Sequence, residues 1–263
     1  MTDLHRLLEL EAVEKDLYRA NTVFDDEFDL YGGQVAAQAL LAAGCTVDPD
    51  RLPHSLHGYF LRPGESARPT VFKVHRDRDG RSFSARRVVA IQRGEVVFNM
   101  AASFHVERES FAEQDVPMPD TASPEEAEPG ELPRLFSVSA RFPAQPFDGR
   151  ARWPTRFWSK VDERLEGAAP VTEALLHACA LTYLSDISTG VLPAPDGRSG
   201  PGASIDHAVW FHRPADMNDW VLSEYVPRMS GRGRGWYTGS IFARDGQLLA
   251  SIAQECLFRP WPR

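Results

Sequence analysis

The chain has 263 residues, which is enough for one large domain or for two domains of ordinary size. Its 43% hydrophobic and 25% charged residues are typical of a globular protein with a sizeable buried core. The formal net charge of −8 argues against general nucleic-acid binding and against docking on anionic membranes, but it allows a small anionic ligand held by a local group of arginines.

The N-terminal stretch MTDLHRLLELEAVEK does not combine a cationic segment with an apolar core, so we expect no secretory signal there. No apolar run approaches the ~20 residues that a membrane-spanning helix needs. The three cysteines, Cys45, Cys179 and Cys256, lie far apart and form no CxxC motif, which favours reduced thiols in the core over disulfides. These features predict a cytoplasmic protein without stable membrane association.

The first half of the chain predicts a buried helix followed by antiparallel strands. Residues 32–45, GGQVAAQALLAAGC, are small and apolar on nearly all sides, which indicates a helix enclosed by protein. Residues 96–106, VVFNMAASFHV, place apolar side chains at every second position, as in a strand with one buried face. The stretch 107–133 contains nine acidic residues, one arginine and five prolines, so we expect a solvated linker there.

The second half predicts a similar arrangement. Within residues 171–191, VTEALLHACALTYLSDISTGV, apolar residues recur at helical spacing: Ala180, Leu184, Ile187 and Val191. We expect Pro193 to end this helix. The next stretch, PAPDGRSGPGAS at 193–204, is either an ordered flank of a functional site or a mobile loop. An alternating strand pattern returns in LLASIAQECLF at 248–258.

The two halves repeat one plan. Residues 56–63, LHGYFLRP, and 206–214, DHAVWFHRP, both end in two aromatic residues, any residue, arginine and proline. The strands at 96–106 and 248–258 then align at a constant offset of 152 residues. A spacing that holds beyond one motif indicates a true internal duplication. We therefore predict two tandem units, at 1–106 and 151–263, joined by an acidic, proline-rich connection at 107–150.

Three polar residues of the second unit interrupt this pattern. Gln254 lies on the apolar face of its strand, where the first unit has Ala102. Asp186 lies in the predicted helix, near the place of Gln38, where partial desolvation would raise a carboxyl pKa and improve a general base. Ser204 follows the irregular stretch. Each of these residues also has an ordinary structural interpretation. Gln254 could be a core glutamine, Asp186 could lie on an exposed helix face, and Ser204 could be a loop residue.

An antiparallel sheet wrapped around a buried helix, present twice, resembles the double hotdog fold, of the α+β class. The segments YGGQVAAQAL, HSLHGYFLRPG, DGRSFSARRVVAIQRGEVVFNMAASF, SIDHAVWFHRP and DGQLLASIAQE resemble the acyl-CoA thioesterase II family, the TesB-like thioesterases. The resemblance implies hydrolysis of acyl-CoA to fatty acid and CoA without a metal or other cofactor. It implies Asp186, Ser204 and Gln254 as the catalytic set. Ser rather than Thr at 204 departs from the pattern of many relatives but keeps the hydroxyl. We expect a homo-oligomer, a dimer or tetramer.

The same three residues suit thioester hydrolysis chemically. The reaction needs a positioned water, a base that takes its proton and donors for the developing oxyanion. Asp186 can be the base, while Ser204 and Gln254 hold the water. We expect an oxyanion donor at the start of the first helix, where YGGQ suggests the backbone amide of Gly33, although the start of the second helix is an alternative.

Other residues have weaker signals. Arg232 and Arg234 in GRGRG are expected on a hairpin, as either CoA phosphate contacts or solvated surface arginines. His57 and His207 are either single general bases or ordinary core and edge histidines. No GxSxG motif indicates a serine nucleophile.

Two rival functions fit the same fold. A hotdog enoyl-CoA hydratase would use a paired Asp and His, and a non-catalytic acyl-thioester-binding protein would bind without turnover. Because the first unit has Gln38, Pro53 and Ala102 at the corresponding places, we predict a single active site per chain, in the second unit.

Overall fold

The strands form one continuous, curved antiparallel sheet in the computed structural model, which describes residues 4–22, 29–108, 113–132, 135–145, 155–167, 169–187 and 199–260. The first half contains α1 (Leu4–Leu7), β1 (Leu10–Glu14), β2 (Leu17–Ala20), α2 (Gly32–Gly44), β3 (Arg51–Phe60), β4 (Thr70–Asp79), β5 (Phe83–Gln92) and β6 (Glu95–Val106). The second half contains β7 (Glu128–Gly130), β8 (Val138–Phe142), β9 (Arg156–Val161), α3 (Glu173–Ser185), β10 (Ser199–Ser204), β11 (Asp206–Phe211), β12 (Val221–Gly231), β13 (Arg234–Ala243) and β14 (Leu248–Pro260).

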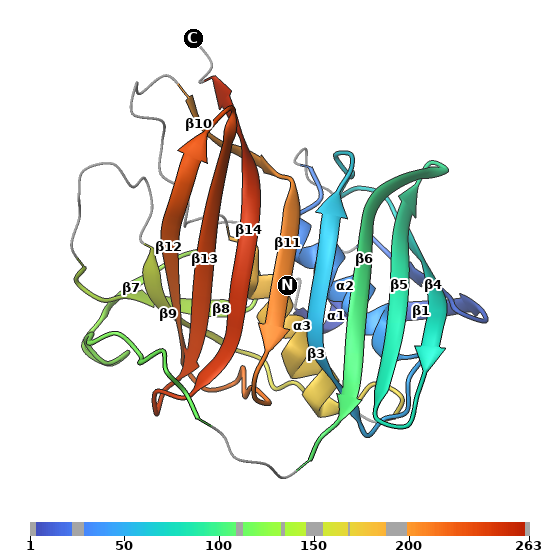
Figure 1. The fold of residues 1–263 in the computed structure, drawn as a ribbon, viewed down its shortest axis with the longest axis horizontal. Helices are drawn as coiled ribbons and strands as arrows, with labels where there is room; N and C mark the ends of the chain where they lie inside the picture. The colour runs from blue at the N-terminus through green and yellow to red at the C-terminus, as the bar shows by residue number, and fades with distance from the viewer. Residues whose placement is uncertain are drawn as a thin grey trace.

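The strand order confirms the internal duplication. The order is β1-β2-β4-β5-β6-β3-β11-β14-β13-β12-β9-β8-β7, so β4-β5-β6-β3 of the first unit mirrors β12-β13-β14-β11 of the second (Figure 1). The units join where β3 pairs with β11. The repeated Arg-Pro motifs make equivalent bonds, because Nη1 of Arg62 donates to the carbonyl of Val96 and Nη1 of Arg213 donates to that of Leu248, each at 2.9 Å. The chain is a double hotdog, as expected.

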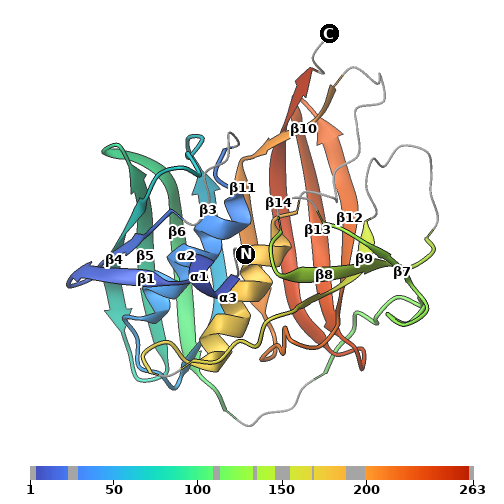
Figure 2. The same cartoon turned by 180° about the vertical axis from the view of Figure 1, so that it is seen from behind.

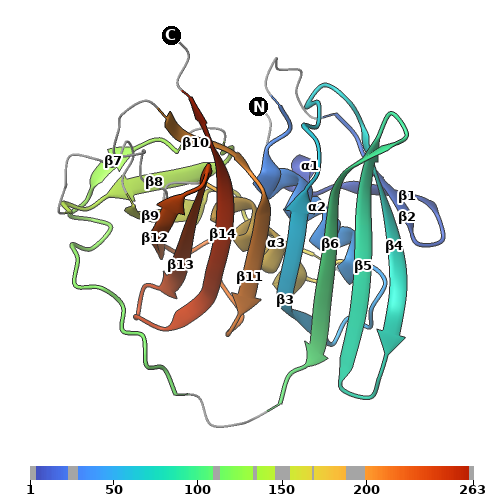
Figure 3. The ribbon, with the colours of Figure 1, turned by 45° about the horizontal axis from the view of Figure 1, so that its top comes forward.

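Both long helices lie on the inner face of the sheet, as the view from behind shows (Figure 2). Helix α2 is buried along almost its whole length, which its run of alanine, glycine and leucine permits. The helices run antiparallel: Gly33 at the start of α2 lies beside Tyr183 near the end of α3, and Gly44 lies beside Leu175 near the start of α3. The sheet curves around this pair (Figure 3), and one hydrophobic core spans both units.

The second helix is shorter than the sequence predicts. Helix α3 ends at Ser185, and Asp186 is its C-cap residue with φ −91° and ψ 38°, so the expectation that Asp186 lies inside the helix is wrong. Residues 188–198 lie outside the described residues, which leaves that part of the predicted helix and of the irregular stretch 193–204 undescribed. The remainder, Ser199–Ser204, forms β10, which pairs with β14.

The acidic connection is not a free linker over its whole length. Gln114 bonds through its side chain to the backbone of Gly246 and Leu248, and the indole of Trp158 donates to the carbonyl of Ala122. Ala127 is buried in a small second core against the outer part of this unit. Strand β8, which falls in 107–150, pairs with β9 and extends the sheet. Composition alone missed these anchors, because a few apolar and amide side chains suffice to hold an acidic segment on a folded surface.

All three cysteines are free thiols. Among the described residues, none of the helices has the length and apolar character needed to cross a membrane.

Candidate functional site

Asp186 lies at the C-terminal end of α3 and is only 5% exposed. A carboxylate at this end of a helix is near the negative end of the helix dipole, and it is stabilised only if other groups compensate. Two side chains donate to its Oδ1: the amide Nε2 of Gln254 at 2.5 Å and the hydroxyl of Ser204 at 3.2 Å. The carboxylate is therefore buried and held by specific donors.

Gln254 lies on β14 with its side chain on the inner face, opposite Tyr237 of β13, and it is fully buried. The strand parity predicted from the sequence is confirmed, because Ile252 and Cys256 on the same face are buried as well. Besides its bond to Asp186, Nε2 of Gln254 donates to Oγ of Ser204 at 2.6 Å. The amide thus connects the other two predicted site residues.

Ser204 is the last residue of β10 and pairs with Cys256 of β14. The register between β10 and β14 shifts between Pro201 and Ser204, which turns the chain from β10 towards β11. The structure brings Asp186, Ser204 and Gln254 together from three separate elements. A cluster of carboxylate, hydroxyl and amide can take a proton from a water and orient that water by hydrogen bonds.

The start of α2, from the other unit, lies against this cluster. A Cβ atom built on Gly32 would be 2.2 Å from Oδ2 of Asp186, and one on Gly33 would be 2.3 Å from the carbonyl oxygen of Tyr183. Tyr31 does not cap the helix with its side chain, since its hydroxyl donates to the same Tyr183 carbonyl at 2.9 Å. The N–H groups of a helix's first turn have no partner within the helix and carry partial positive charge, so they favour the carboxylate and any other anion placed there.

A further polar pair, His207 and Ser185, lies behind Gln254. Nδ1 of His207 is 2.5 Å from Oε1 of Gln254, and its Nε2 is 2.7 Å from the hydroxyl of Ser185. The ring is fully buried, and this burial lowers the pKa of His207 to about 4, although the hydrogen bond with Gln254 acts in the opposite direction. Because both ring nitrogens bond protein groups, His207 does not have the position of a single general base.

His57 lies on the other face of the sheet. Its neighbour Leu56 is buried in the core, whereas the His57 side chain is exposed and its Nε2 lies 3.1 Å from Oδ2 of Asp206. The paired Asp and His expected of a hydratase would need a histidine beside Asp186. The structure instead places Ser204 and Gln254 there, with His207 behind the amide.

The two arginines of the GRGRG segment lie at the predicted hairpin between β12 and β13. Arg232 is exposed in the turn with φ 52°, and Arg234 begins β13. The side chain of Arg234 points to the same side of the sheet as that of the exposed Trp236, which is the side opposite Gln254. It forms an ion pair with Glu255 at 3.4 Å. Arg232 is thus the more available of the two for a ligand at this end of the sheet.

The first unit contains no equivalent cluster in its described residues. Since α2 ends at Gly44 and α3 at Ser185, the residue that corresponds to Asp186 is Cys45, rather than Gln38 as the sequence alignment suggests. Burial raises the pKa of the Cys45 thiol to about 11, so it is protonated at neutral pH. Gln38 donates to the carbonyl of Leu7 at 2.7 Å, away from the Asp186 cluster.

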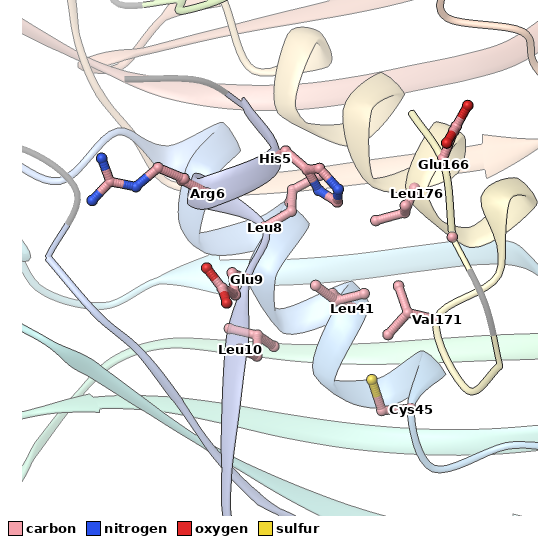
Figure 4. Close-up of a pocket in the computed structure, with 11 residues that line it drawn as sticks. His5, Arg6, Leu8, Glu9, Leu10, Leu41, Cys45, Glu166, Val171 and Leu176 are labelled. Carbon is pink, nitrogen blue, oxygen red and sulfur yellow. The ribbon is translucent and has the colours of Figure 1, made fainter. Parts of the chain in front are cut away.

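A separate cavity of about 540 Å³ lies near the end of α2 and the start of α3 (Figure 4). Asp186 is at the other end of α3. The apolar walls of the cavity include Leu41 and Cys45 near the end of α2 and Val171 and Leu176 near the start of α3. From the N-terminal segment, the cavity is lined by His5, Arg6, Leu8, Glu9 and Leu10. Within the described ranges, no group of three or more His, Cys, Asp or Glu side chains is placed to hold a metal ion.

Comparison with known proteins finds two matching family models. The model of the acyl-CoA thioesterase N-terminal domain matches residues 26–105, and that of the acyl-CoA thioesterase C-terminal domain matches residues 112–258. The model of the C-terminal domain begins at residue 112, so its match includes most of the acidic connection at 107–150. Gln114 and Ala122 of this connection bond residues of the second unit.

Individual relatives resemble the chain over nearly its whole length. Acyl-CoA thioesterase 2 of Haemophilus influenzae is 34% identical and the alignment covers 98% of each chain. Acyl-coenzyme A thioesterase 8 of Homo sapiens is 31% identical, with 98% of this chain and 89% of the relative covered. The crystal structure of an acyl-CoA thioesterase II, TesB2, from Mycobacterium marinum is 35% identical, covers 98% of both chains and superposes with a TM-score of 0.81.

Proposed function

Because this chain belongs to the acyl-CoA thioesterase II family and is an acyl-CoA thioester hydrolase, we propose that Asp186, Ser204 and Gln254 hold and activate the water that cleaves the thioester. The observation that carries this proposal is the position of the Gln254 amide, 2.5 Å from Asp186 and 2.6 Å from Ser204. Three residues far apart in the sequence converge on one buried point next to a helix N-terminus, as water activation requires.

In the proposed reaction, a water enters among Asp186, Ser204 and Gln254 and takes the place of one of the hydrogen bonds that these side chains make to each other. Held there by Ser204 and Gln254, it attacks the thioester carbonyl carbon. Asp186 takes one proton from the water as the C–O bond forms, and the carbonyl oxygen becomes an oxyanion. The tetrahedral intermediate then collapses, the C–S bond breaks, and the proton held by Asp186 passes to the CoA sulfur. The products are the free fatty acid and CoA, and Asp186 returns to its ionised form.

We assign the oxyanion donor to the start of α2, with the amide of Gly33 as the candidate and that of Gly32 next to it. The start of α2 lies beside Asp186, whereas the start of α3 is at the far end of its own helix and is capped by Thr172, whose side chain accepts from the Leu175 N–H. Oriented N–H groups that are already in place stabilise a developing oxyanion strongly, because they need no reorganisation. In this proposal the second unit supplies the base and the first unit supplies the oxyanion donor.

Other finer assignments rest on less specific features. Arg232 is the candidate contact for the CoA phosphates, with Arg234 beside it, because the exposed hairpin lies at the end of the sheet where β10 joins β14. A homo-oligomer, dimer or tetramer, is supported by exposed apolar side chains on the outer face of the sheet: Tyr59, Trp210, Met229 and Trp236. The three free thiols suit the cytoplasm.

The test is steady-state release of free thiol from acyl-CoA by Asp186→Asn and Gln254→Ala variants. We expect each to lower kcat by ~10²- to 10⁴-fold, the range for removal of a positioned base or donor. Gln38→Ala, which removes a buried amide outside the cluster, should stay within a few-fold of wild type. A folded Asp186→Asn enzyme with a near wild-type rate would show that the base is elsewhere. A folded variant with half the wild-type rate would show that a second active site operates.

A further inference from the structure

The side-chain amide of Gln254 can do its work in only one of its two orientations. With Nε2 towards the cluster, its N–H groups point to Oδ1 of Asp186 and Oγ of Ser204, and a water that takes the place of either partner can accept from them. If the amide turned over, Oε1 would lie about as close to Asp186 Oδ1, and two oxygen atoms would face each other without a proton between them. The orientation must therefore be enforced from the other side of the amide.

That other side is occupied by His207. Its Nδ1 lies 2.5 Å from Oε1 of Gln254, so Nδ1 must carry a proton if Oε1 is to accept a bond there. In a neutral ring, Nε2 is then an acceptor, and the Ser185 hydroxyl at 2.7 Å is the donor that it requires. The Ser185 oxygen is also 2.9 Å from the Thr182 carbonyl, but its single proton can serve only one of the two acceptors at a time. With Gln254 oriented as it is here, the hydrogen bonds of His207 are satisfied when the proton is on Nδ1 and the Ser185 hydroxyl donates to Nε2.

We infer that His207 is a positioning residue for the hydrolysis: by donating from Nδ1 to Oε1 of Gln254, it holds the amide so that both N–H groups face Asp186 and Ser204. The inference rests on the proposed role of Gln254 in holding the water. His207 itself does not contact the reacting atoms. Complete burial of the ring supports this role, because a buried donor and acceptor pair is costly to leave unmade and resists rearrangement.

The internal repeat separates this role from simple packing. When the two Arg-Pro motifs are aligned, Leu56 of the first unit is the residue equivalent to His207, just as Ala102 is equivalent to Gln254. Leu56 is 2% exposed, so an apolar side chain fills the equivalent position of the first unit. Strand β11 therefore does not need a histidine at this place for the hotdog fold. The polar residues at 207 and 254 occur together, in the unit that holds Asp186.

Two substitutions at 207 separate hydrogen bonding from packing. His207→Leu copies the first unit and removes the donor, whereas His207→Asn keeps an N–H near the place of Nδ1. We expect Leu to lower kcat by ~10- to 100-fold with little change in KM, the range typical of partners that orient a functional ligand. Asn should restore kcat to within ~5-fold of wild type. His212→Leu is the matched control, because His212 also bonds a serine, Ser251 at 2.9 Å, but lies outside the cluster; it should keep wild-type kcat.

The decisive measurement repeats His207→Leu in the Gln254→Ala background. If His207 acts through Gln254, the second substitution should change kcat there by less than ~2-fold. A similar loss in both backgrounds, or a folded His207→Leu enzyme with wild-type kcat, would overturn the inference. Circular dichroism and thermal unfolding establish folding, and His207→Met replaces Leu if the Leu variant does not fold. Active Asp186→Asn would refute the proposed mechanism, whereas impaired Asp186→Asn beside unimpaired His207→Leu would refute the positioning role alone.

Discussion

Gly32 and Asp186 approach each other so closely that a methyl group on Gly32 would lie 2.2 Å from Oδ2 of the carboxylate. Gly32 begins α2 in the first unit, and Asp186 ends α3 in the second. The contact can form only because the two helices run antiparallel across the seam between the units. The candidate site therefore depends on both copies of the duplication, even though its three polar side chains come from the second.

This contact makes Gly32 a sensitive position. Gly32→Ala should displace the Asp186 carboxylate and lower kcat by ~10²-fold or more, because small misplacements of a catalytic group are costly. The measurement is kcat for thiol release, with circular dichroism as the check on folding. Gly231→Ala is the matched control, since a Cβ there would meet only the flexible end of Met229 at 3.4 Å. Full activity in a folded Gly32→Ala enzyme would argue against Asp186 as the base.

The hydroxyl at 204 should matter more than the size of the side chain. Ser204 accepts from Gln254 and donates to Asp186, and it is only partly buried, so an added methyl group has room. We expect Ser204→Thr to keep kcat within ~5-fold and Ser204→Ala to lower it by ~10- to 100-fold, because Ala leaves a buried amide N–H unsatisfied. Equal kcat/KM for Ala and wild type would return Ser204 to a structural role.

The hairpin arginines should affect binding of the CoA part of the substrate. Arg232→Asn keeps a residue that tolerates the positive φ of this turn, while it removes the charge. We expect KM for acyl-CoA to rise by ~3- to 10-fold at low salt, equivalent to ~1 kcal/mol for an exposed charge pair. KM for an acyl-pantetheine thioester, which lacks the nucleotide phosphates, should not change. An equal effect on both substrates would mean that Arg232 acts on the fold and not on the phosphates.

Acid should destabilise the protein through His207. Burial lowers the pKa of His207 from its ordinary 6.5 to about 4. Between these two pH values, the histidine binds a proton in the unfolded chain but not in the folded chain. The contribution of neutral His207 to the free energy of unfolding is therefore fully present above about pH 6.5, and it is lost as the pH falls towards about 4.

His207→Asn removes this titration and leaves the carboxylates in place. Between about pH 7 and pH 4.5, the free energy of unfolding of wild type should fall by on the order of 2–3 kcal/mol more than that of the variant. Urea unfolding at the two pH values measures the difference. Parallel losses in both proteins would show that His207 is not buried in its neutral form.

Local periodicity predicted much of the fold and part of the site. The alternation in 248–258 predicted that Gln254 points inward, and the small apolar run at 32–45 predicted α2. His207 was named from the sequence only as a general base or an ordinary core or edge histidine. Its place beside Gln254 was not predicted, although its counterpart in the first unit is the apolar Leu56. The end of α3 was not predictable from spacing, because apolar residues continue at helical intervals beyond Ser185.

The sequence by itself determined the duplication, the buried helices, the inward parity of the strands and the polar residues that interrupt an apolar face, because these depend on a residue's near neighbours. Only the tertiary structure decided that Asp186 meets Gly32, that the Gln254 amide joins Asp186 to Ser204, and that His207 lies behind it. Such encounters depend on the register of β11 and β10 against β14 and on the antiparallel packing of α2 and α3. Register and helix packing are set by contacts between residues distant in the chain, which periodicity does not encode.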